Sequence, residues 1–268
     1  MLSILKLNGP LVMGILNATP DSFSDGGQFQ RQEQALQHAQ QMIADGADVI
    51  DIGGESTRPG AKAVSVDEEL QRVIPLLEAI RELGKPISVD TSKPQVMQAA
   101  IEAGASMIND VRALTAEGAL EVVAASKVEV CLMHMQGQPR DMQQQPTYHN
   151  LVTEVMDFLQ QRVQACADVG IEKSRICLDP GIGFGKTLEH NCRLLKELPS
   201  LTSCGLPLLV GVSRKSMLGQ ILGVEVDQRM VASVAAGLIA VAKGAKILRV
   251  HDVLATRQAL DIYQAIES

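Results

Sequence analysis

Short apolar runs alternate with longer stretches of helical spacing along the whole chain. Eight of these runs have the length of a β-strand and end in polar residues or glycine, namely residues 11–17, 48–54, 86–90, 106–110, 128–134, 175–179, 208–213 and 246–251. Strands that alternate with helices indicate repeated βαβ units and a parallel sheet, and eight such units close a barrel. We therefore predict an α/β protein with one (β/α)8 TIM barrel domain over residues 1–268.

The segments between the runs carry apolar stripes at helical spacing. Ser65 and Glu68 form the pattern of a capping box, and the stripe that follows it contains Val66, Leu70, Val73, Leu77 and Ile80. The segment 230–242 (MVASVAAGLIAVA) is apolar on nearly every face, so a helix there needs partners on both sides. One side would pack on the barrel, and the other is either a subunit interface or is covered by helices of the same chain.

Composition narrows the class of protein. Hydrophobic residues make up 46% of the 268 positions, enough for a large core, and the length suits one α/β barrel of about 250 residues. A net charge of -7 argues against a general nucleic-acid binder, which needs a basic face. The longest apolar stretch is too short for a membrane span of ~20 residues, and the first ten residues lack the pattern of a secretory signal. We expect a soluble protein.

The five cysteines show neither C-x-x-C nor paired Cys/His spacing. Cys131 and Cys177 lie inside apolar strand runs, where a free cysteine acts as a small buried hydrophobe. This usage fits a reducing compartment, and we expect a cytoplasmic protein.

The eighth run carries two cationic side chains at its end. Arg249 and His251 are two residues apart, so they lie on the same side of a strand. If that side faces the barrel mouth, the pair presents donors to an anion such as a phosphate group. The alternative is that Arg249 pairs with an acidic side chain and His251 is a satisfied core residue.

The seventh run leads into GVSRKS, where a helix is expected to begin. Backbone N–H groups at such a start favour anions, and Ser213 is a plausible cap. Lys215 could alternatively form a Schiff base, as in aldolase barrels, although such a lysine usually lies within a strand and this one follows its end.

Three polar residues close the third, fourth and sixth runs: Asp90, Asn109 and Asp179. Together with Lys215 they form a mixed donor and acceptor lining that suits a flat heterocycle with amino, N–H and carbonyl edges. Two buried carboxylates are costly, so either a ligand or Lys215 must satisfy them. Each residue taken singly could instead cap a helix.

Seven segments resemble, in order and across nearly the whole chain, the bacterial dihydropteroate synthases of folate biosynthesis. The segments are GILNATPDSFSDGG, DIGGESTRPG, SVDTSKP, IND, LDPGIGFGK, LLVGVSRKS and RVHD. The resemblance implies a (β/α)8 barrel that displaces pyrophosphate from (7,8-dihydropterin-6-yl)methyl diphosphate with the amine of p-aminobenzoate. It also implies a homodimer, dependence on Mg2+ and inhibition by sulfonamides.

The resemblance assigns roles to individual positions. The pterin would be held by Asp90, Asn109, Asp179 and Lys215. The diphosphate would be bound by Thr57, Arg58, Arg249 and His251, and by Asn17, which would also coordinate the Mg2+. The p-aminobenzoate site would be shaped by Phe23, Thr57, Pro59, Phe184, Ser213 and Lys215. Asp90, Arg249, His251 and Lys215 would be the catalytic residues. The family implies a cationic dihydropterin after C–O cleavage, which the Asp90 carboxylate would stabilise.

Other functions remain open at this stage. A methyltetrahydrofolate-dependent methyltransferase shares the pterin-binding carboxylates and amide but has no use for Arg58, Arg249 and His251. A non-catalytic pterin-binding protein would be expected to lose Asn17, Arg58 or His251 first, and all are present. We assign no catalytic role to His134, for which packing or anchoring of a loop is expected.

Overall fold

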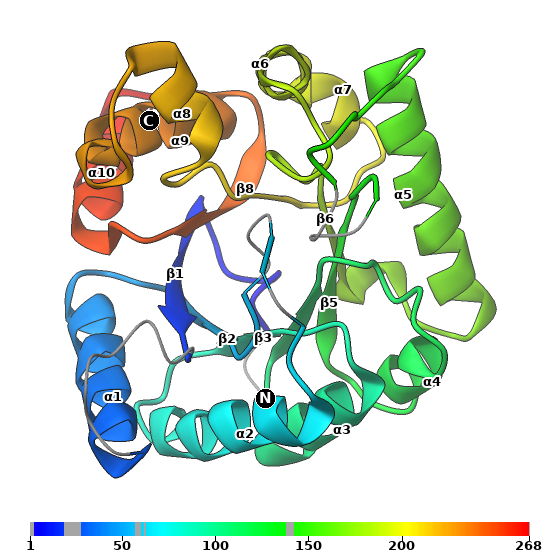
Figure 1. Cartoon of the computed structure of the whole chain (residues 1–268), viewed down its shortest axis with the longest axis vertical. Helices are drawn as coiled ribbons and strands as arrows, with labels where there is room; N and C mark the ends of the chain where they lie inside the picture. The colour runs from blue at the N-terminus through cyan, green and yellow to red at the C-terminus, as the bar shows by residue number, and fades with distance from the viewer. Residues whose placement is uncertain (1–2, 19–27, 57–59, 62, 138–141, 268) are drawn as a thin grey trace.

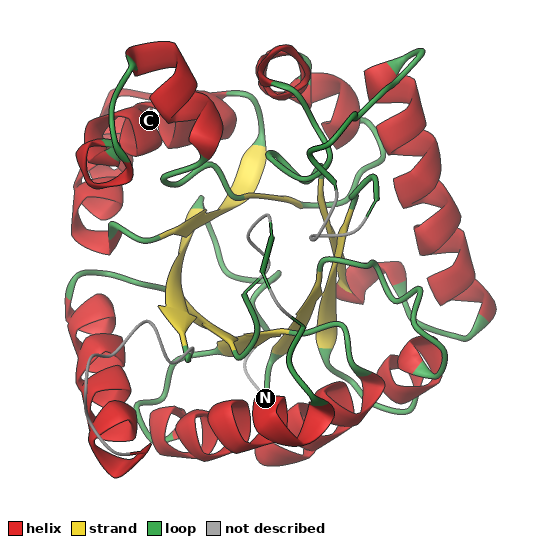
Figure 2. Ribbon diagram, in the orientation of Figure 1, coloured by secondary structure: helices red, strands yellow, loops and turns green. Residues whose placement is uncertain are grey.

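Eight parallel strands form a closed barrel in the order β1 to β8, and helices surround it (Figure 1). The computed structural model describes residues 3–18, 28–56, 60–61, 63–137 and 142–267. Side chains of residues 28–31 lie outside this description. Figure 2 shows the strands as an inner ring with the helices outside it, which is the predicted (β/α)8 architecture.

The strands are short, and every connection between them contains at least one helix. The strands are β1 (Leu11–Asn17), β2 (Val49–Gly53), β3 (Ile87–Asp90), β4 (Met107–Asp110), β5 (Glu129–Met133), β6 (Ile176–Asp179), β7 (Leu208–Val210) and β8 (Ala245–Val250). The α-helices are α1 (Gln28–Ala44), α2 (Val66–Arg81), α3 (Pro94–Ala103), α4 (Ala119–Ala124), α5 (Leu151–Asp168), α6 (Leu188–Lys196), α7 (Leu198–Thr202), α8 (Ser216–Leu222), α9 (Met230–Ala242) and α10 (Val253–Glu267). Two 3-10 turns, η2 (Lys173–Arg175) and η3 (Val226–Gln228), precede β6 and α9.

All eight predicted strands are confirmed, but four of them, β2, β5, β7 and β8, stop before the predicted last residue. β7 stops at Val210, three residues before Ser213, and β8 stops one residue before His251. The register between β7 and β8 shifts at Leu208 and Leu209, and such an irregularity shortens a ladder. Beyond β7 the backbone turns sharply, because Arg214 has a φ of 57°.

Apolar side chains fill the barrel interior toward the N-terminal ends of the strands, which we call the lower end. One cluster of buried side chains comes from the strands and the N-terminal segment: Ile4, Leu11, Met13, Val49, Met107, Cys131, Cys177, Leu209 and Ile247. The Glu129 carboxylate accepts hydrogen bonds from the backbone N–H groups of Ile4 and Leu5, which holds the N-terminal segment under the barrel. Cys131 and Cys177 are buried free thiols, as predicted. The polar C-terminal ends of the strands therefore lie at the opposite end of the barrel, which we call the upper end or mouth.

The helix caps only partly follow the sequence prediction. Ser65 caps α2 by accepting a hydrogen bond from the Glu68 backbone N–H at 3.2 Å. The Glu68 side chain instead forms an ion pair with Arg72, one turn further along. The apolar stripe of α2 is buried at Val73, Leu77 and Ile80.

Exposed apolar side chains gather on the last quarter of the chain. Of the large hydrophobic residues that the structure describes, all the exposed ones except Leu7 and Val169 lie between residues 221 and 266. Within α9, Val231 and Ile239 are 74% and 51% exposed, so neighbouring helices of the same chain do not cover this side. In Figure 1 the helices α8, α9 and α10 lie together at one corner of the molecule. Among the described residues, the helices include none long and apolar enough to cross a bilayer.

Candidate active site

Two buried carboxylates hold the guanidinium of Arg249 at the mouth of the barrel. Arg249 donates from Nε to Asp51 Oδ2 at 2.7 Å and from Nη2 to Asp90 Oδ2 at 2.9 Å. Asp51 is completely buried, and its second oxygen, Oδ1, has no hydrogen-bond partner among the described residues. The pairing of Arg249 with acidic side chains, the alternative considered above, is therefore what the structure shows.

Asp90 is placed by the barrel strands rather than by a helix cap. It ends β3, pairs in register with Gly53 on one side and Asn109 on the other, and is 7% exposed. The N-cap residues of α3, α4 and α6 are Lys93, Gly118 and Thr187, so the reading of Asp90, Asn109 and Asp179 as helix caps is wrong. The three side chains remain available to the barrel mouth.

Lys215 follows β7, the strand next to the one that carries Arg249, and lies close to a third carboxylate, Asp179. Its ammonium is 4.1 Å from the centre of the Phe184 ring, a cation–π contact. Asp179 accepts a hydrogen bond from the Gly181 backbone N–H at 2.7 Å and attracts Lys215 electrostatically. Thus Asp90 accepts a hydrogen bond from Arg249 and Asp179 accepts one from a backbone N–H, whereas the expected partner of both was either a ligand or Lys215.

Burial favours the uncharged forms of Asp90, Asp179 and Lys215 and shifts their pKa values accordingly. Burial raises the pKa of Asp90 to about 7, against the opposing effect of Arg249. Burial also raises the pKa of Asp179 and lowers the pKa of Lys215 to about 8. For Arg249 burial acts against the charge, but Asp51 and Asp90 outweigh it and raise its pKa. Such shifted groups in a concave site are typical of binding and catalysis.

Ser213 and His251 contact each other at the ends of neighbouring strands. Ser213 Oγ accepts a hydrogen bond from the His251 backbone N–H at 3.1 Å and lies 3.0 Å from His251 Nδ1. The N-cap residue of α8 is Lys215, whose side chain forms no capping hydrogen bond. The prediction that Ser213 caps this helix is therefore wrong. The reason is the positive φ of Arg214, which separates Ser213 from the helix start.

Asn17 ends β1 beside the same mouth. A Cβ atom placed on Gly53 would lie 3.9 Å from Asn17 Oδ1 and 3.9 Å from the Cβ of Asp90, so the absent side chain leaves room for about one methyl group in contact with both residues. An amide oxygen is a hard ligand that suits Mg2+, which keeps several waters and takes phosphate oxygens as its other ligands. No group of three or more His, Cys, Asp or Glu residues with metal-binding geometry occurs in the described part of the chain. Asn17 therefore fits Mg2+ only when a phosphate group shares the ion.

Two residues at the site escaped the sequence reasoning. Asp51 lies in the middle of β2 rather than at a strand end, and the signal for it in the sequence is a carboxylate between Ile50 and Ile52. Lys186, within the quoted LDPGIGFGK segment, is 2% exposed and lies 3.0 Å from His134 Nδ1. His134 packs edge-on against Phe158, which fits the packing role expected for it.

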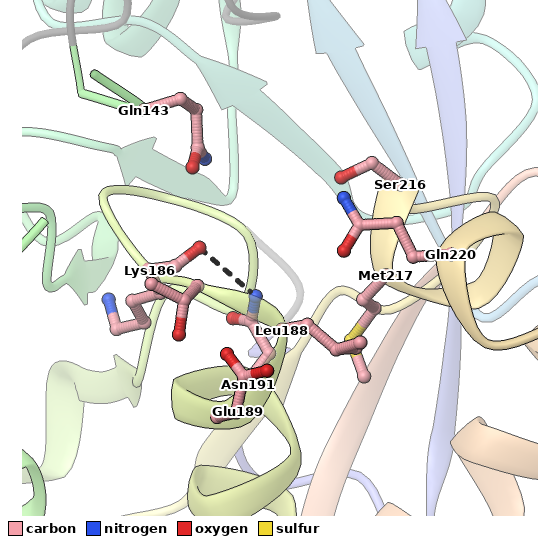
Figure 3. A pocket seen from close by; sticks show the side chains of 9 residues that line it. Gln143, Lys186, Leu188, Glu189, Asn191, Ser216, Met217 and Gln220 are labelled. Carbon is pink, nitrogen blue, oxygen red and sulfur yellow. Dashed lines mark hydrogen bonds between the residues drawn. The ribbon is translucent and has the colours of Figure 1, made fainter. Parts of the chain in front are cut away.

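A cavity of about 350 Å³ opens beside Lys186 (Figure 3). Gln143, Lys186, Thr187, Leu188, Glu189, Asn191, Ser216, Met217 and Gln220 line it. Figure 3 shows Leu188, Glu189 and Asn191 of α6 on one side and Ser216, Met217 and Gln220 of α8 on the other, while Gln143 comes from a separate loop. The cavity is thus a polar opening next to the pair of Phe184 and Lys215.

Several predicted site residues cannot be placed. Phe23, Thr57, Arg58 and Pro59 lie outside the described residues. The structure brings together Asn17, Asp90, Asn109, Asp179, Phe184, Ser213, Lys215, Arg249 and His251 at the upper end of the barrel or directly beyond its strands.

The closed barrel and the buried carboxylates and cations at its mouth are those of an α/β-barrel protein with a polar ligand site. A model of the pterin binding enzyme family matches residues 13–251. The dihydropteroate synthase of Haemophilus influenzae is 52% identical over 262 residues, covering 97% of this chain and 95% of the relative.

Solved structures agree with this relationship. The dihydropteroate synthase of Xanthomonas albilineans with 4-aminobenzoic acid superposes with a TM-score of 0.92 at 52% identity, covering 97% of this chain and 93% of that one. A sulfonamide complex of the Yersinia pestis dihydropteroate synthase also gives a TM-score of 0.92, at 54% identity, covering 96% and 94% of the two chains. The chain belongs to the dihydropteroate synthase family.

Proposed function

We propose that the enzyme joins the amine of p-aminobenzoate to the methylene carbon of (7,8-dihydropterin-6-yl)methyl diphosphate at this barrel mouth. The products are 7,8-dihydropteroate and pyrophosphate. The observation that carries the proposal is the meeting of Asp90 and Arg249 at the ends of β3 and β8, facing Asp179 and Lys215. Relatives named dihydropteroate synthase over nearly the full chain support it.

The pterin would lie among the side chains of Asp90, Asn109, Asp179 and Lys215. A carboxylate accepts from the amino and ring N–H groups of a pterin, while an ammonium or an amide N–H donates to its carbonyl edge. Asp90 and Asp179 are 7% and 6% exposed, so a bound ring replaces the remaining water around both carboxylates. Ionised Asp90 would also stabilise positive charge that develops on the dihydropterin after C–O cleavage.

The diphosphate would lie toward β8 and β1. Arg249 uses Nε and Nη2 for its two carboxylates, so its Nη1 edge is left to donate to a phosphate oxygen. His251 stands beyond it, oriented by Ser213. Thr57 and Arg58, by the family resemblance, would complete this subsite.

Mg2+ is the proposed cofactor, and the Asn17 amide oxygen would hold it together with oxygens of the diphosphate. When bound, the ion would neutralise charge on the leaving group. Gly53 leaves room beside Asn17, which is the feature of this chain that accommodates an ion there.

The p-aminobenzoate would pack against the Phe184 ring, next to Lys215 and Ser213. Phe184 is 9% exposed and contacts the Lys215 ammonium, so one face of the aromatic substrate would meet a wall that is already built. Phe23, Thr57 and Pro59 are proposed to form the rest of the pocket. One C–O bond breaks with its electron pair leaving on pyrophosphate, one C–N bond forms, and the amine releases one proton. An aryl amine has a free lone pair, so no strong general base is needed.

The proposed reaction predicts pyrophosphate release that requires both substrates. The purified chain is incubated with the pterin diphosphate, p-aminobenzoate and Mg2+, and pyrophosphate and 7,8-dihydropteroate are quantified. Omission of p-aminobenzoate should abolish formation of the pteroate. Absence of product with all components present would reject the reaction.

We further propose that the chain is a cytoplasmic homodimer. Exposed apolar side chains concentrate on α8, α9 and α10, and such a concentration of apolar residues is typical of subunit interfaces. A second copy of the same face would cover Val231 and Ile239. The free cysteines fit a reducing compartment.

A further inference from the structure

We propose that Lys186 is a positioning residue for p-aminobenzoate. Its buried ammonium ties the connection between β6 and α6 to the end of β5, and this contact fixes Phe184 against Lys215. The inference rests on the proposed function, because Phe184 is there the wall of the p-aminobenzoate pocket. It assigns a role to a lysine that touches neither substrate.

The Lys186 ammonium has a hydrogen-bond partner for each of its three protons. Nζ lies 3.0 Å from the Phe184 carbonyl oxygen, 3.0 Å from His134 Nδ1 and 3.4 Å from the His134 carbonyl oxygen. Because an ammonium only donates, His134 Nδ1 must accept, which requires the neutral ring with its proton on Nε2. Burial and the nearby Lys186 charge accordingly lower the pKa of His134 to about 3.

Burial of the Lys186 ammonium is costly, and these hydrogen bonds together with the nearby Asp179 carboxylate offset that cost. Lys186 is 2% exposed, and burial lowers its pKa to about 7 although Asp179 acts in the opposite direction. Figure 3 shows the amine of Lys186 pointing away from Ser216 and Gln220, while its backbone carbonyl accepts a hydrogen bond from the Asn191 side chain. The lysine side chain thus faces the protein interior rather than the cavity.

The connection that carries Phe184 lies directly on the backbone that follows β5. A Cβ atom on Gly181 would come within 1.9 Å of the His134 carbonyl oxygen, and one on Gly185 within 2.3 Å of the Gln136 carbonyl oxygen. Both glycines have positive φ, at 69° and 60°. The two backbones therefore meet at a distance that only glycine permits, and Lys186 is the side chain that fastens them together.

The consequence reaches the substrate pocket through Phe184. Lys186 binds the backbone carbonyl of Phe184, and the Phe184 ring in turn lies 4.1 Å from the Lys215 ammonium. Loss of the Lys186 contacts would let the Phe184 wall move, whereas the pterin-binding carboxylates Asp90 and Asp179 are held by the barrel strands. Displacement of a positioning group by a fraction of an ångström is enough to weaken binding.

The test is the replacement Lys186→Met, which keeps the length of the side chain and removes the ammonium. We expect the KM for p-aminobenzoate to rise about tenfold, while the KM for the pterin diphosphate changes less than about twofold. Lys186→Arg, which keeps a cation able to donate, should restore part of the loss. The matched control is Lys196→Met, an exposed lysine at the end of α6, the helix that follows Lys186, and it should behave as wild type.

A second variant addresses the same contact without touching the lysine. His134→Phe keeps an aromatic ring against Phe158 but removes the Nδ1 acceptor, and it should also raise the KM for p-aminobenzoate selectively. Unchanged KM values in folded Lys186→Met would overturn the proposal. If that variant does not fold, unchanged KM values in His134→Phe overturn it equally. Wild-type enzyme in the same assay tests the proposed reaction itself, so failure of the two can be told apart.

Discussion

The Nε atom of Arg249 lies 2.7 Å from Oδ2 of Asp51, a carboxylate that is completely buried in the middle of β2. This contact leaves Asp51 Oδ1 without a partner among the described residues. A buried carboxylate with an unsatisfied oxygen lowers the stability of the fold. In return, the Asp51 carboxylate orients the guanidinium of Arg249. Asp51 thereby fixes which edge of Arg249 faces the proposed diphosphate.

Asp51→Asn should therefore impair use of the pterin diphosphate. The substitution keeps the volume of the side chain but removes the charge that orients Arg249, so we expect kcat/KM for the pterin diphosphate to fall roughly tenfold to a hundredfold. The matched control is Asp48→Asn, which weakens the ion pair with Arg257 at the residue just before the same strand begins. Steady-state kinetics that show the same loss in both variants would contradict the orienting role.

The pH dependence of kcat/KM for the pterin diphosphate should be a narrow bell. Asp90 must be ionised to accept from the pterin, and its pKa of about 7 makes activity rise as the pH passes that value. Lys215 must be protonated to donate, and its pKa of about 8 makes activity fall above it. Because the groups interact, the two limbs report apparent values for the whole cluster.

Variants can assign the two limbs of this profile. Lys215→Arg keeps the positive charge at high pH, so the alkaline limb should move to higher pH while the acid limb stays. Asp90→Asn should lower the rate and remove the limb near pH 7. An alkaline limb that is the same in Lys215→Arg and wild type would show that another group controls it.

The sequence predicted the elements of this site better than the contacts between them. The alternation of apolar runs located all eight strands, and polar residues at or next to the strand ends located Asp90, Asn109 and Asp179, because parallel strands in a barrel present their ends on one face. Asp51 was missed because its role depends on Arg249, which is 198 positions away in the chain. No local pattern carries such a pairing.

The seventh strand shows a different limit of sequence reasoning. The apolar run LLVGVS predicts a strand that reaches Ser213, but β7 ends at Val210. The register shift beside β8 and the positive φ of Arg214 are properties of the folded backbone, and the residue types at these positions do not predict them. As a result Ser213 contacts His251 instead of capping α8.

Removal of Mg2+ should abolish product formation, and Asn17→Ala should raise the Mg2+ concentration needed for half of the maximal rate. Loss of one oxygen ligand weakens a metal site by about tenfold or more. Asn17→Asp keeps an oxygen at the same position and serves as the comparison. The measurement is a Mg2+ titration after treatment with a chelator. Identical titration curves for Asn17→Ala and wild type would place the metal elsewhere.

A sulfonamide should compete with p-aminobenzoate for the Phe184 wall. The apparent inhibition constant should rise in proportion to the p-aminobenzoate concentration and remain independent of saturating pterin diphosphate. Phe184→Leu should raise the KM for p-aminobenzoate and the inhibition constant together, by roughly threefold to tenfold, because both aromatic rings lose the same stacking partner. Inhibition that does not respond to p-aminobenzoate would mean that the drug binds outside this pocket.

Substitution of two exposed apolar residues on α9, Val231 and Ile239, tests whether this helix forms the dimer interface. Val231 and Ile239 lie eight positions apart on one face of the helix and are 74% and 51% exposed. Burying both at a twofold interface would contribute about 1.5–3 kcal/mol for each fully covered side chain, so two aspartates there should dissociate a dimer. Val231→Asp/Ile239→Asp is therefore expected to sediment as a monomer where wild type sediments as a dimer. Val169→Asp, at an exposed valine after α5, should leave the dimer intact. A wild-type chain that sediments as a monomer at micromolar concentration would refute the interface.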